Sequence, residues 1–178
     1  MTSKFTKEML STRKFELYQQ NAEVIQFLRN NPVIAAEQLL GVKLLDYQKY
    51  ILQRTWSCQY SMWTLSRNAA KTFEGAVLIM LKQLLYENGE IYIIAPTGKQ
   101  SKNLFQNIEK IATDSVSTIK GLKDIYLSEL QKHQAQHSGF KHDPASFEAT
   151  CMSGTPVRTL NGVIDNNRGA RSSLIFFD

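Results

Sequence analysis

The spacing of apolar residues divides the chain into a helical first third and a longer part in which strands and helices alternate. Up to about residue 56, apolar positions recur at helical spacing, and Pro32 and Gly41 break the pattern into three or four helices. Beyond that point, short apolar runs typical of buried strands alternate with amphipathic stretches typical of helices. The predicted strands are 60–65, 91–95, 147–152, 157–160 and 173–177, and the predicted helices are 73–86, 99–112 and 122–136. We therefore expect an α/β fold with a largely parallel central sheet flanked by helices.

Composition is that of a globular protein of the cytoplasm. Of the 178 residues 43% are hydrophobic, which is enough for a sizeable core, and no apolar run is long enough to cross a membrane. The chain starts without a secretory signal, so we expect a cytoplasmic protein with no membrane partner. Cys58 and Cys151 lack metal-ligand spacing, which favours reduced, structural thiols. The formal charge of +5 fits a polyanionic partner, but it fits a mildly basic protein equally well.

A loop between a predicted strand and a predicted helix carries residue types that bind a nucleoside triphosphate. Such a site needs backbone amides around the phosphates, a lysine to neutralise them and a hydroxyl for Mg²⁺. Lys71 supplies the ammonium group and Thr72 the hydroxyl. The usual pattern would place glycines at Leu65 and Ala70, but small residues end the loop and the strand-loop-helix context is right. The alternative is a polar turn whose lysine is merely solvated.

The other end of the sequence offers a partner for this loop. Four apolar residues lead to Asp178, as in the strand that carries the second Mg²⁺ ligand of phosphate-loop NTPases. An aspartate at the end of a strand is common by itself, but this one follows the loop by about 100 residues. Together the two motifs predict a P-loop NTPase fold of the Asp-Glu type.

The loop also resembles a known family. Ser66–Thr72 is similar to the loop of viral terminase large subunits, in which serine and arginine replace the opening glycine region and the lysine-threonine pair is kept. Three further motifs match in order: Leu45–Gln48, which resembles the adenine-contacting segment; Ile94–Thr97 with Gln100, Ser101 and Phe105; and Arg168–Arg171 leading to Asp178. The resemblance implies an N-terminal helical segment, 1–57, that completes the adenine pocket, and a partial phosphate-loop ATPase core, 58–178.

The resemblance implies a role for each matching residue. Lys71 would hold the β and γ phosphates of ATP, Thr72 would bind Mg²⁺, and Asp178 would hold Mg²⁺ directly or through water. Arg67 would stabilise charge developing on the γ phosphate, and Arg168 would reach the nucleotide of a neighbouring subunit or, as an equal alternative, cover the sheet edge. Residues expected to contact ATP are Tyr47, Gln48, Ser66, Arg67, Asn68, Ala69, Ala70, Lys71 and Thr72. Without its companion motifs, the Tyr-Gln pair would be ordinary helix surface.

The activity and partners follow from the same resemblance. Terminase large subunits couple ATP hydrolysis to the movement of double-stranded viral DNA into a procapsid, as a homo-oligomeric ring with the portal protein and the terminase small subunit. Hydrolysis in this class needs a glutamate after the Mg²⁺-binding aspartate, and the sequence stops at Asp178. We therefore expect this chain to bind ATP but hydrolyse it slowly. We also expect it to lack the nuclease domain and the strand that separates the two motif strands, so that its sheet is incomplete.

Other functions fit parts of the sequence. Helicase-like translocases share the Ala-Pro-Thr motif, and Thr155–Arg158 resembles one of their DNA-contacting motifs, but they keep Gly-Lys-Thr where this chain has Ala-Lys-Thr. A non-catalytic module would use a degenerate nucleotide fold only for DNA docking or oligomerisation. His133 and His137 share a predicted helix face, but without the glutamate of a HExxH site we expect no metal there. Lysines that would track DNA phosphates, or equally be solvated, are Lys99, Lys102, Lys110, Lys120, Lys123 and Lys132.

Overall fold

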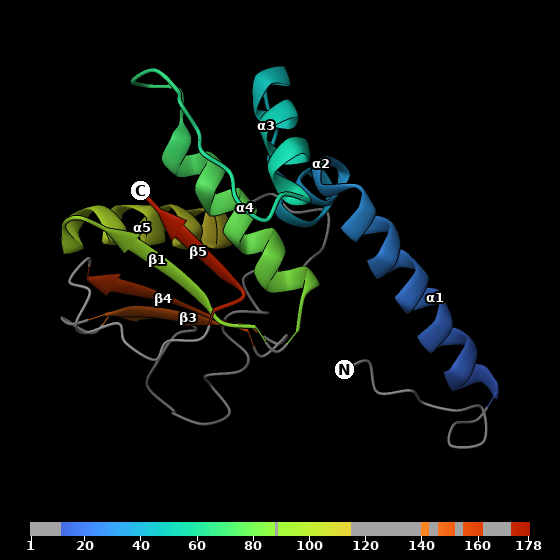
Figure 1. Ribbon diagram of the computed structural model, residues 1–178. Coiled ribbons are helices and arrows are strands. Elements are labelled where there is room, and N and C mark those ends of the chain that lie inside the picture. Colours follow the sequence, from blue (N-terminus) through green and yellow to red (C-terminus); the bar gives the residue numbers. More distant parts are fainter. Residues whose placement is uncertain (1–11, 88, 115–139, 143–145, 152–154, 162–171) are drawn as a thin grey trace.

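The computed structural model describes residues 12–87, 89–114, 140–142, 146–151, 155–161 and 172–178 (Figure 1). The helices are α1 (Thr12–Asn30), α2 (Pro32–Ala35), the π-helical turn η1 (Ala36–Leu40), α3 (Asp46–Trp56), α4 (Lys71–Leu85) and α5 (Gly98–Asp114). The strands are β1 (Ile91–Ala95), β2 (Phe140–His142), β3 (Phe147–Thr150), β4 (Pro156–Asn161) and β5 (Leu174–Phe177). The chain is therefore α/β, as the alternation of sequence patterns predicts.

The strands form one mixed sheet in the order β2-β3-β4-β1-β5. β1 pairs in parallel with β4 on one side and with β5 on the other, so that Tyr92 lies opposite both Arg158 and Ile175. The β2-β3 and β3-β4 pairs are antiparallel. The prediction of a largely parallel sheet is therefore wrong for half of these pairings. The reason is that short connections join β2, β3 and β4, and short connections return the chain antiparallel.

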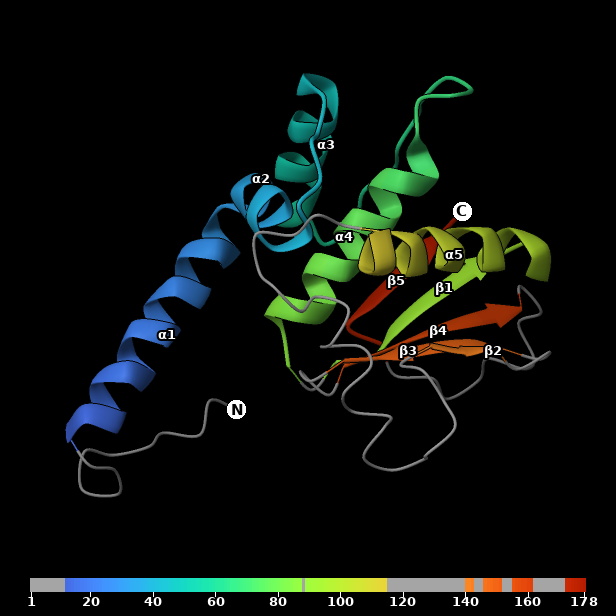
Figure 2. The same cartoon turned by 180° about the vertical axis from the view of Figure 1, so that it is seen from behind.

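α4 and α5 cover the same face of the sheet (Figures 1 and 2). α4 is buried continuously from Glu74 to Leu81, as expected of a helix enclosed on all sides. A Cβ atom built on Gly75 would lie 2.5 Å from Cζ of Phe176, so the glycine lets α4 approach β5 closely. On the opposite face of β5, Ile175 and Phe177 are exposed.

The N-terminal helices join the core through α3. Leu52 and Trp56 of α3 are buried with Leu40 of η1 in the same hydrophobic core as α4. α1 meets the rest of the chain near its last turn and extends away from the sheet, leaving Val24 and Phe27 exposed (Figures 1 and 2).

Most predicted elements are confirmed, and one strand is not. The helices predicted at 73–86 and 99–112 correspond to α4 and α5, and the strands predicted at 91–95, 147–152, 157–160 and 173–177 correspond to β1, β3, β4 and β5. The strand predicted at 60–65 is wrong: these residues are irregular, and Tyr60 and Met62 are each 86% exposed. A β-rich sequence becomes a strand only beside a backbone that pairs with it. The helix predicted at 122–136 lies outside the described residues.

Candidate functional site

The loop before α4 places two of its residues in the left-handed backbone region. Asn68 has φ 66° and Ala70 has φ 50°, both in the left-handed region. Asparagine tolerates that region, but for alanine the left-handed conformation costs roughly 1–2 kcal/mol. Successive amides that alternate between right- and left-handed conformations form a concave, anion-binding nest. The strain at Ala70 therefore lies where the usual sequence pattern has glycine.

The first amides of α4 lie before the first hydrogen bond of the helix. No side chain of the described residues caps this end, and the first helical hydrogen bond runs from the N–H of Glu74 to the carbonyl of Ala70, 3.0 Å away. The N–H groups of Lys71, Thr72 and Phe73 precede that bond and so have no acceptor within the helix. The positive end of the helix dipole adds to their attraction for an anion.

Lys71 and Asp178 are close enough to interact, although the whole α/β core separates them in sequence. Burial raises the pKa of the Asp178 carboxyl, and the Lys71 ammonium lowers it in part. The Nζ atom of Lys71 donates a hydrogen bond to the carbonyl of Leu65, 3.3 Å away. In both views the carboxyl end of β5 lies beside the amino end of α4 (Figures 1 and 2). The fold thus brings the lysine of the loop and the aspartate of the last strand to one place.

Backbone pairing fixes the position of Asp178. Its N–H donates to the carbonyl of Ile94 at 3.1 Å, which extends the β1-β5 pairing by one residue. The turn at Thr97 follows β1 at this same end of the sheet, and the carbonyl of Thr97 accepts from the N–H of Gln100 to begin α5. Ser101 and Phe105, the remaining residues of that motif, are buried and serve packing.

The residues at this position fit a magnesium ion by their chemistry. Mg²⁺ prefers hard oxygen ligands and takes few of them from the protein, because phosphates and waters complete its octahedron. Thr72, next to Lys71 in the first turn of α4, offers a hydroxyl oxygen, and Asp178 offers a carboxylate. In the part of the chain that the structure describes, no group of three or more His, Cys, Asp or Glu side chains could hold a metal by itself.

Of the two residues predicted to contact adenine, only Tyr47 touches the loop. Its hydroxyl donates to the carbonyl of Ala69 at 3.4 Å, and its side chain is 42% exposed, which leaves ring surface open beside the loop. Gln48 is buried, and its Oε1 atom accepts from the N–H of Leu45 at 2.8 Å. The side chain of Gln48 therefore caps the start of α3, as the third residue of a capping box does. Contact between Gln48 and a base stays a prediction.

Only one of the arginines predicted to contribute to the site, Arg67, lies among the described residues. Arg67 is exposed, as are Ser66 and Asn68 beside it. Arg168 and Arg171 lie outside the described residues. Of the lysines proposed for DNA contact, Lys99 and Lys110 are exposed on α5, and the ring of Phe147 lies 4.7 Å from Nζ of Lys102. Outside the described residues are Lys120, Lys123, Lys132, His133 and His137.

Glu74, which the sequence analysis did not single out, is buried directly after the loop. It is 1% exposed, and among the described residues no donor reaches either carboxylate oxygen. Burial raises the pKa of this carboxyl to about 7. An acid in an amphipathic helix gives no sequence signal of burial, so this position could not have been found from the pattern.

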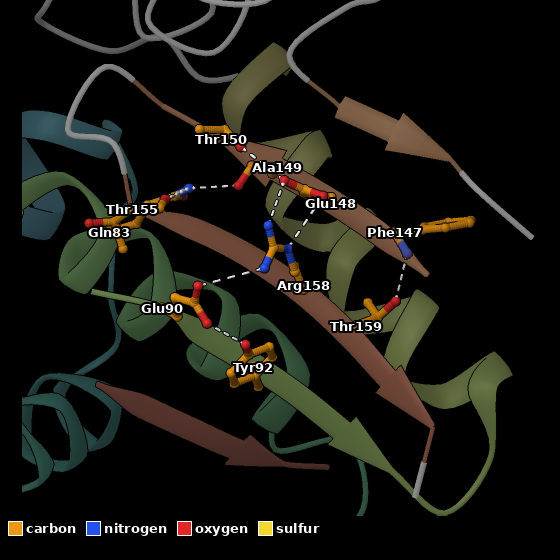
Figure 3. A network of polar contacts seen from close by, with 10 residues as sticks. All are labelled: Gln83, Glu90, Tyr92, Phe147, Glu148, Ala149, Thr150, Thr155, Arg158 and Thr159. Atoms are coloured by element: carbon orange, nitrogen blue, oxygen red, sulfur yellow. Dashed lines mark hydrogen bonds and ion pairs between the residues drawn. The ribbon is translucent and has the colours of Figure 1, made fainter. Parts of the chain in front are cut away.

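Arg158, the residue that suggested a helicase motif, is already neutralised by carboxylates. Its guanidinium lies 3.4 Å from the carboxylate of Glu148 and 3.7 Å from that of Glu90 (Figure 3). The hydroxyl of Tyr92 donates to Glu90 in the same network. These residues lie on the sheet face opposite to α4, on β1, β3 and β4, with Glu90 directly before β1. The network is therefore separate from the loop and leaves Arg158 poorly suited to hold DNA phosphate.

The cysteines and the described histidine show no catalytic arrangement. Cys58 is exposed and Cys151 is buried, and neither forms a disulfide. His142 pairs with Glu109 of α5 at 3.0 Å and packs edge-on against Phe147. Within the described residues, none of the helices combines the length and apolar character needed to cross a membrane.

Comparison with protein-family models gives no match, and comparison with curated proteins gives none either. Function therefore has to be inferred from the residues of this chain and their geometry.

Proposed function

We propose that this chain is the ATP-binding part of a DNA-packaging motor of the terminase large-subunit type. In such a motor, ATP hydrolysis would drive double-stranded DNA into a procapsid, with the portal protein and the terminase small subunit as partners and a ring of subunits as the working form. The single observation that carries the proposal is that Lys71 lies near enough to Asp178 for its charge to lower the pKa of that carboxyl. A solvated lysine in a polar turn would have no reason to lie beside the aspartate of a distant strand.

In this proposal, the loop residues bind the phosphates and the residue after β5 binds the metal ion. The free amides at the start of α4 would surround the phosphates, and Lys71 would exchange the carbonyl of Leu65 for phosphate oxygens. Thr72 and Asp178 would hold Mg²⁺, which supplies charge neutralisation between the phosphates. Tyr47 would place its ring against the base, and Arg67 is free to turn toward the γ phosphate.

Slow hydrolysis remains the expectation. A general base must reach the attacking water, and the buried carboxyl of Glu74 is enclosed by protein, with burial as the sole cause of its pKa shift. Glu74 is therefore no substitute for the water-orienting glutamate of the family.

The test is a calorimetric titration of the chain with a non-hydrolysable ATP analogue, with and without Mg²⁺. We expect saturable binding that Lys71→Ala weakens roughly 10- to 100-fold, because a charge-assisted hydrogen bond contributes about 1.5–3 kcal/mol. Asp178→Asn should keep the binding seen without Mg²⁺ and lose the gain that Mg²⁺ gives. Lys110→Ala, which removes an exposed charge on α5, is the matched control and should bind as the wild type does. Equal affinity of the wild type and Lys71→Ala would refute the proposal.

A further inference from the structure

Trp63 makes two directed contacts from the irregular segment that precedes the loop. Its Nε1 atom donates a hydrogen bond to the hydroxyl oxygen of Thr55, 2.9 Å away on α3. Its ring packs edge-to-face on Phe176 of β5, with centroids 5.5 Å apart and an interplanar angle of 71°. Of residues 60–65, Trp63 is the one that packs against the hydrophobic core, while Tyr60 and Met62 point into solvent.

These two contacts join the three elements that carry the site. Thr55 belongs to α3, the helix whose Tyr47 reaches the loop. Phe176 lies two residues before Asp178 on β5 and is also the ring that Gly75 of α4 approaches closely. Trp63 itself lies two residues before Leu65, whose carbonyl holds Lys71. No paired strand fixes this segment within the described residues, so the indole is what ties it to α3 and β5.

We propose that Trp63 is a positioning residue of the nucleotide site, which holds the loop, α3 and β5 in their working arrangement; the inference rests on the proposed function. A tryptophan suits this task because its rigid ring and its single N–H donor are both used here, in two different directions. The contact with Phe176 positions the metal side of the site through Asp178. The contact with Thr55 positions the base side through α3.

The two contacts can be separated by substitution. Thr55→Val removes the hydroxyl acceptor at nearly constant volume and leaves the ring contact in place. Trp63→Phe removes the donor but keeps an aromatic ring against Phe176. Trp63→Leu removes both contacts. Phe147→Leu, in the aromatic cluster with Phe105 and His142 far along the sheet, is the control for a loss of packing that leaves the site alone.

The experiment compares the affinities of a non-hydrolysable ATP analogue and of inorganic tripolyphosphate, each with and without Mg²⁺. Thr55→Val should weaken the ATP analogue roughly three- to tenfold and leave tripolyphosphate unchanged, because tripolyphosphate makes no contact on the base side. Trp63→Leu should weaken both ligands about tenfold and reduce the gain in affinity that Mg²⁺ gives. Trp63→Phe should restore that gain. Phe147→Leu should lower thermal stability without changing either affinity.

The outcomes distinguish the positioning role of Trp63 from the proposed function of the chain. Wild-type binding together with an unchanged Mg²⁺ gain in Trp63→Leu, or affinity losses that Phe147→Leu shares, would overturn the positioning role and leave the proposed function standing. Failure of the wild type to bind either ligand would overturn the proposed function and this inference with it. If Trp63→Leu does not fold, Thr55→Val decides alone: equal effects on both ligands, or no effect on the ATP analogue, would overturn the positioning role.

Discussion

The two ends of α4 follow opposite rules. At its carboxyl end the last carbonyl, that of Leu85, accepts from Nε of Arg29 at 2.7 Å. At its amino end, Ala70 is strained and the first amides have no side-chain cap. One end of the helix is thus completed by the fold, and the other is left open where a ligand would complete it.

The completed end is a junction of three helix termini. Trp56, the last residue of α3, donates from Nε1 to the carbonyl of Arg29 in α1 at 2.6 Å. Lys82 of α4 donates to the carbonyl of Trp56 at 3.1 Å, and its ammonium lies 4.1 Å from the centre of the Trp56 ring. Burial lowers the pKa of Lys82. Cations favour the negative ends of helices, so Arg29 and Lys82 stabilise this junction.

The carboxyl end of α4 stabilises the fold, whereas the amino end is where we propose that the nucleotide binds. Every polar group of the junction described above has a partner, which is the usual state of buried polar groups. At the loop end, the buried carboxylate of Glu74 has no partner among the described residues, and the backbone of Ala70 is strained. Such departures concentrate at functional sites, because unsatisfied groups and strain there are resolved by the ligand.

The largest effect is expected at the junction. Trp56→Ala should lower the free energy of unfolding by about 3–5 kcal/mol, because it removes a buried ring together with its hydrogen bond. Urea denaturation followed by circular dichroism measures the change. Trp56→Phe keeps most of the ring and should cost less. Affinity for an ATP analogue, measured where the variant is still folded, should fall much less than in Lys71→Ala; a loss as large as that of Lys71→Ala would mean that the two ends are not independent.

A pH-dependent effect is expected from Glu74 at the open end. The pKa of Glu74 rises from 4.5 to about 7 on folding, so between these values the folded chain keeps a proton that the unfolded chain has lost. The free energy of unfolding should therefore fall by roughly 3 kcal/mol as pH rises through this window. Glu74→Gln, which is neutral throughout, should gain about that much stability over wild type between pH 4 and pH 8.

Denaturation of wild type and Glu74→Gln at both pH values provides the measurement. A constant difference between the two proteins would show that the carboxyl does not ionise within the window. Glu23→Gln, at an exposed acid on α1, serves as the control for general effects of losing a negative charge.

The smallest effect is expected from the strain at Ala70. Glycine adopts the left-handed region without penalty, so Ala70→Gly should raise the free energy of unfolding by about 0.5–1 kcal/mol. Ala69→Gly is the matched control, because Ala69 is not left-handed and glycine there should destabilise by a similar amount. Denaturant midpoints of the two variants should move in opposite directions. A shift in the same direction would mean that the left-handed backbone of Ala70 carries no strain.

The two predictions of secondary structure that were wrong, the strand at 60–65 and the largely parallel sheet, share one cause. The β-rich run at 60–65 has strand propensity but no neighbouring backbone to pair with, so it stays irregular. The alternation of strands and helices predicts a parallel sheet, but the connection between β2 and β3 is too short for a crossover. Each outcome depends on a partner that local sequence does not specify.

The sequence by itself determined the helices α4 and α5, the strand β1, and the presence of both a Lys-Thr loop and an aspartate after an apolar strand, because periodicity and residue chemistry are local properties. Only the tertiary structure decided that Lys71 lies near Asp178, that Glu74 is buried with no partner among the described residues, and that Trp63 joins α3 to β5. The physical reason is that burial and contact belong to pairs of segments far apart in the chain. Their side chains meet only when the sheet and the helices have assembled.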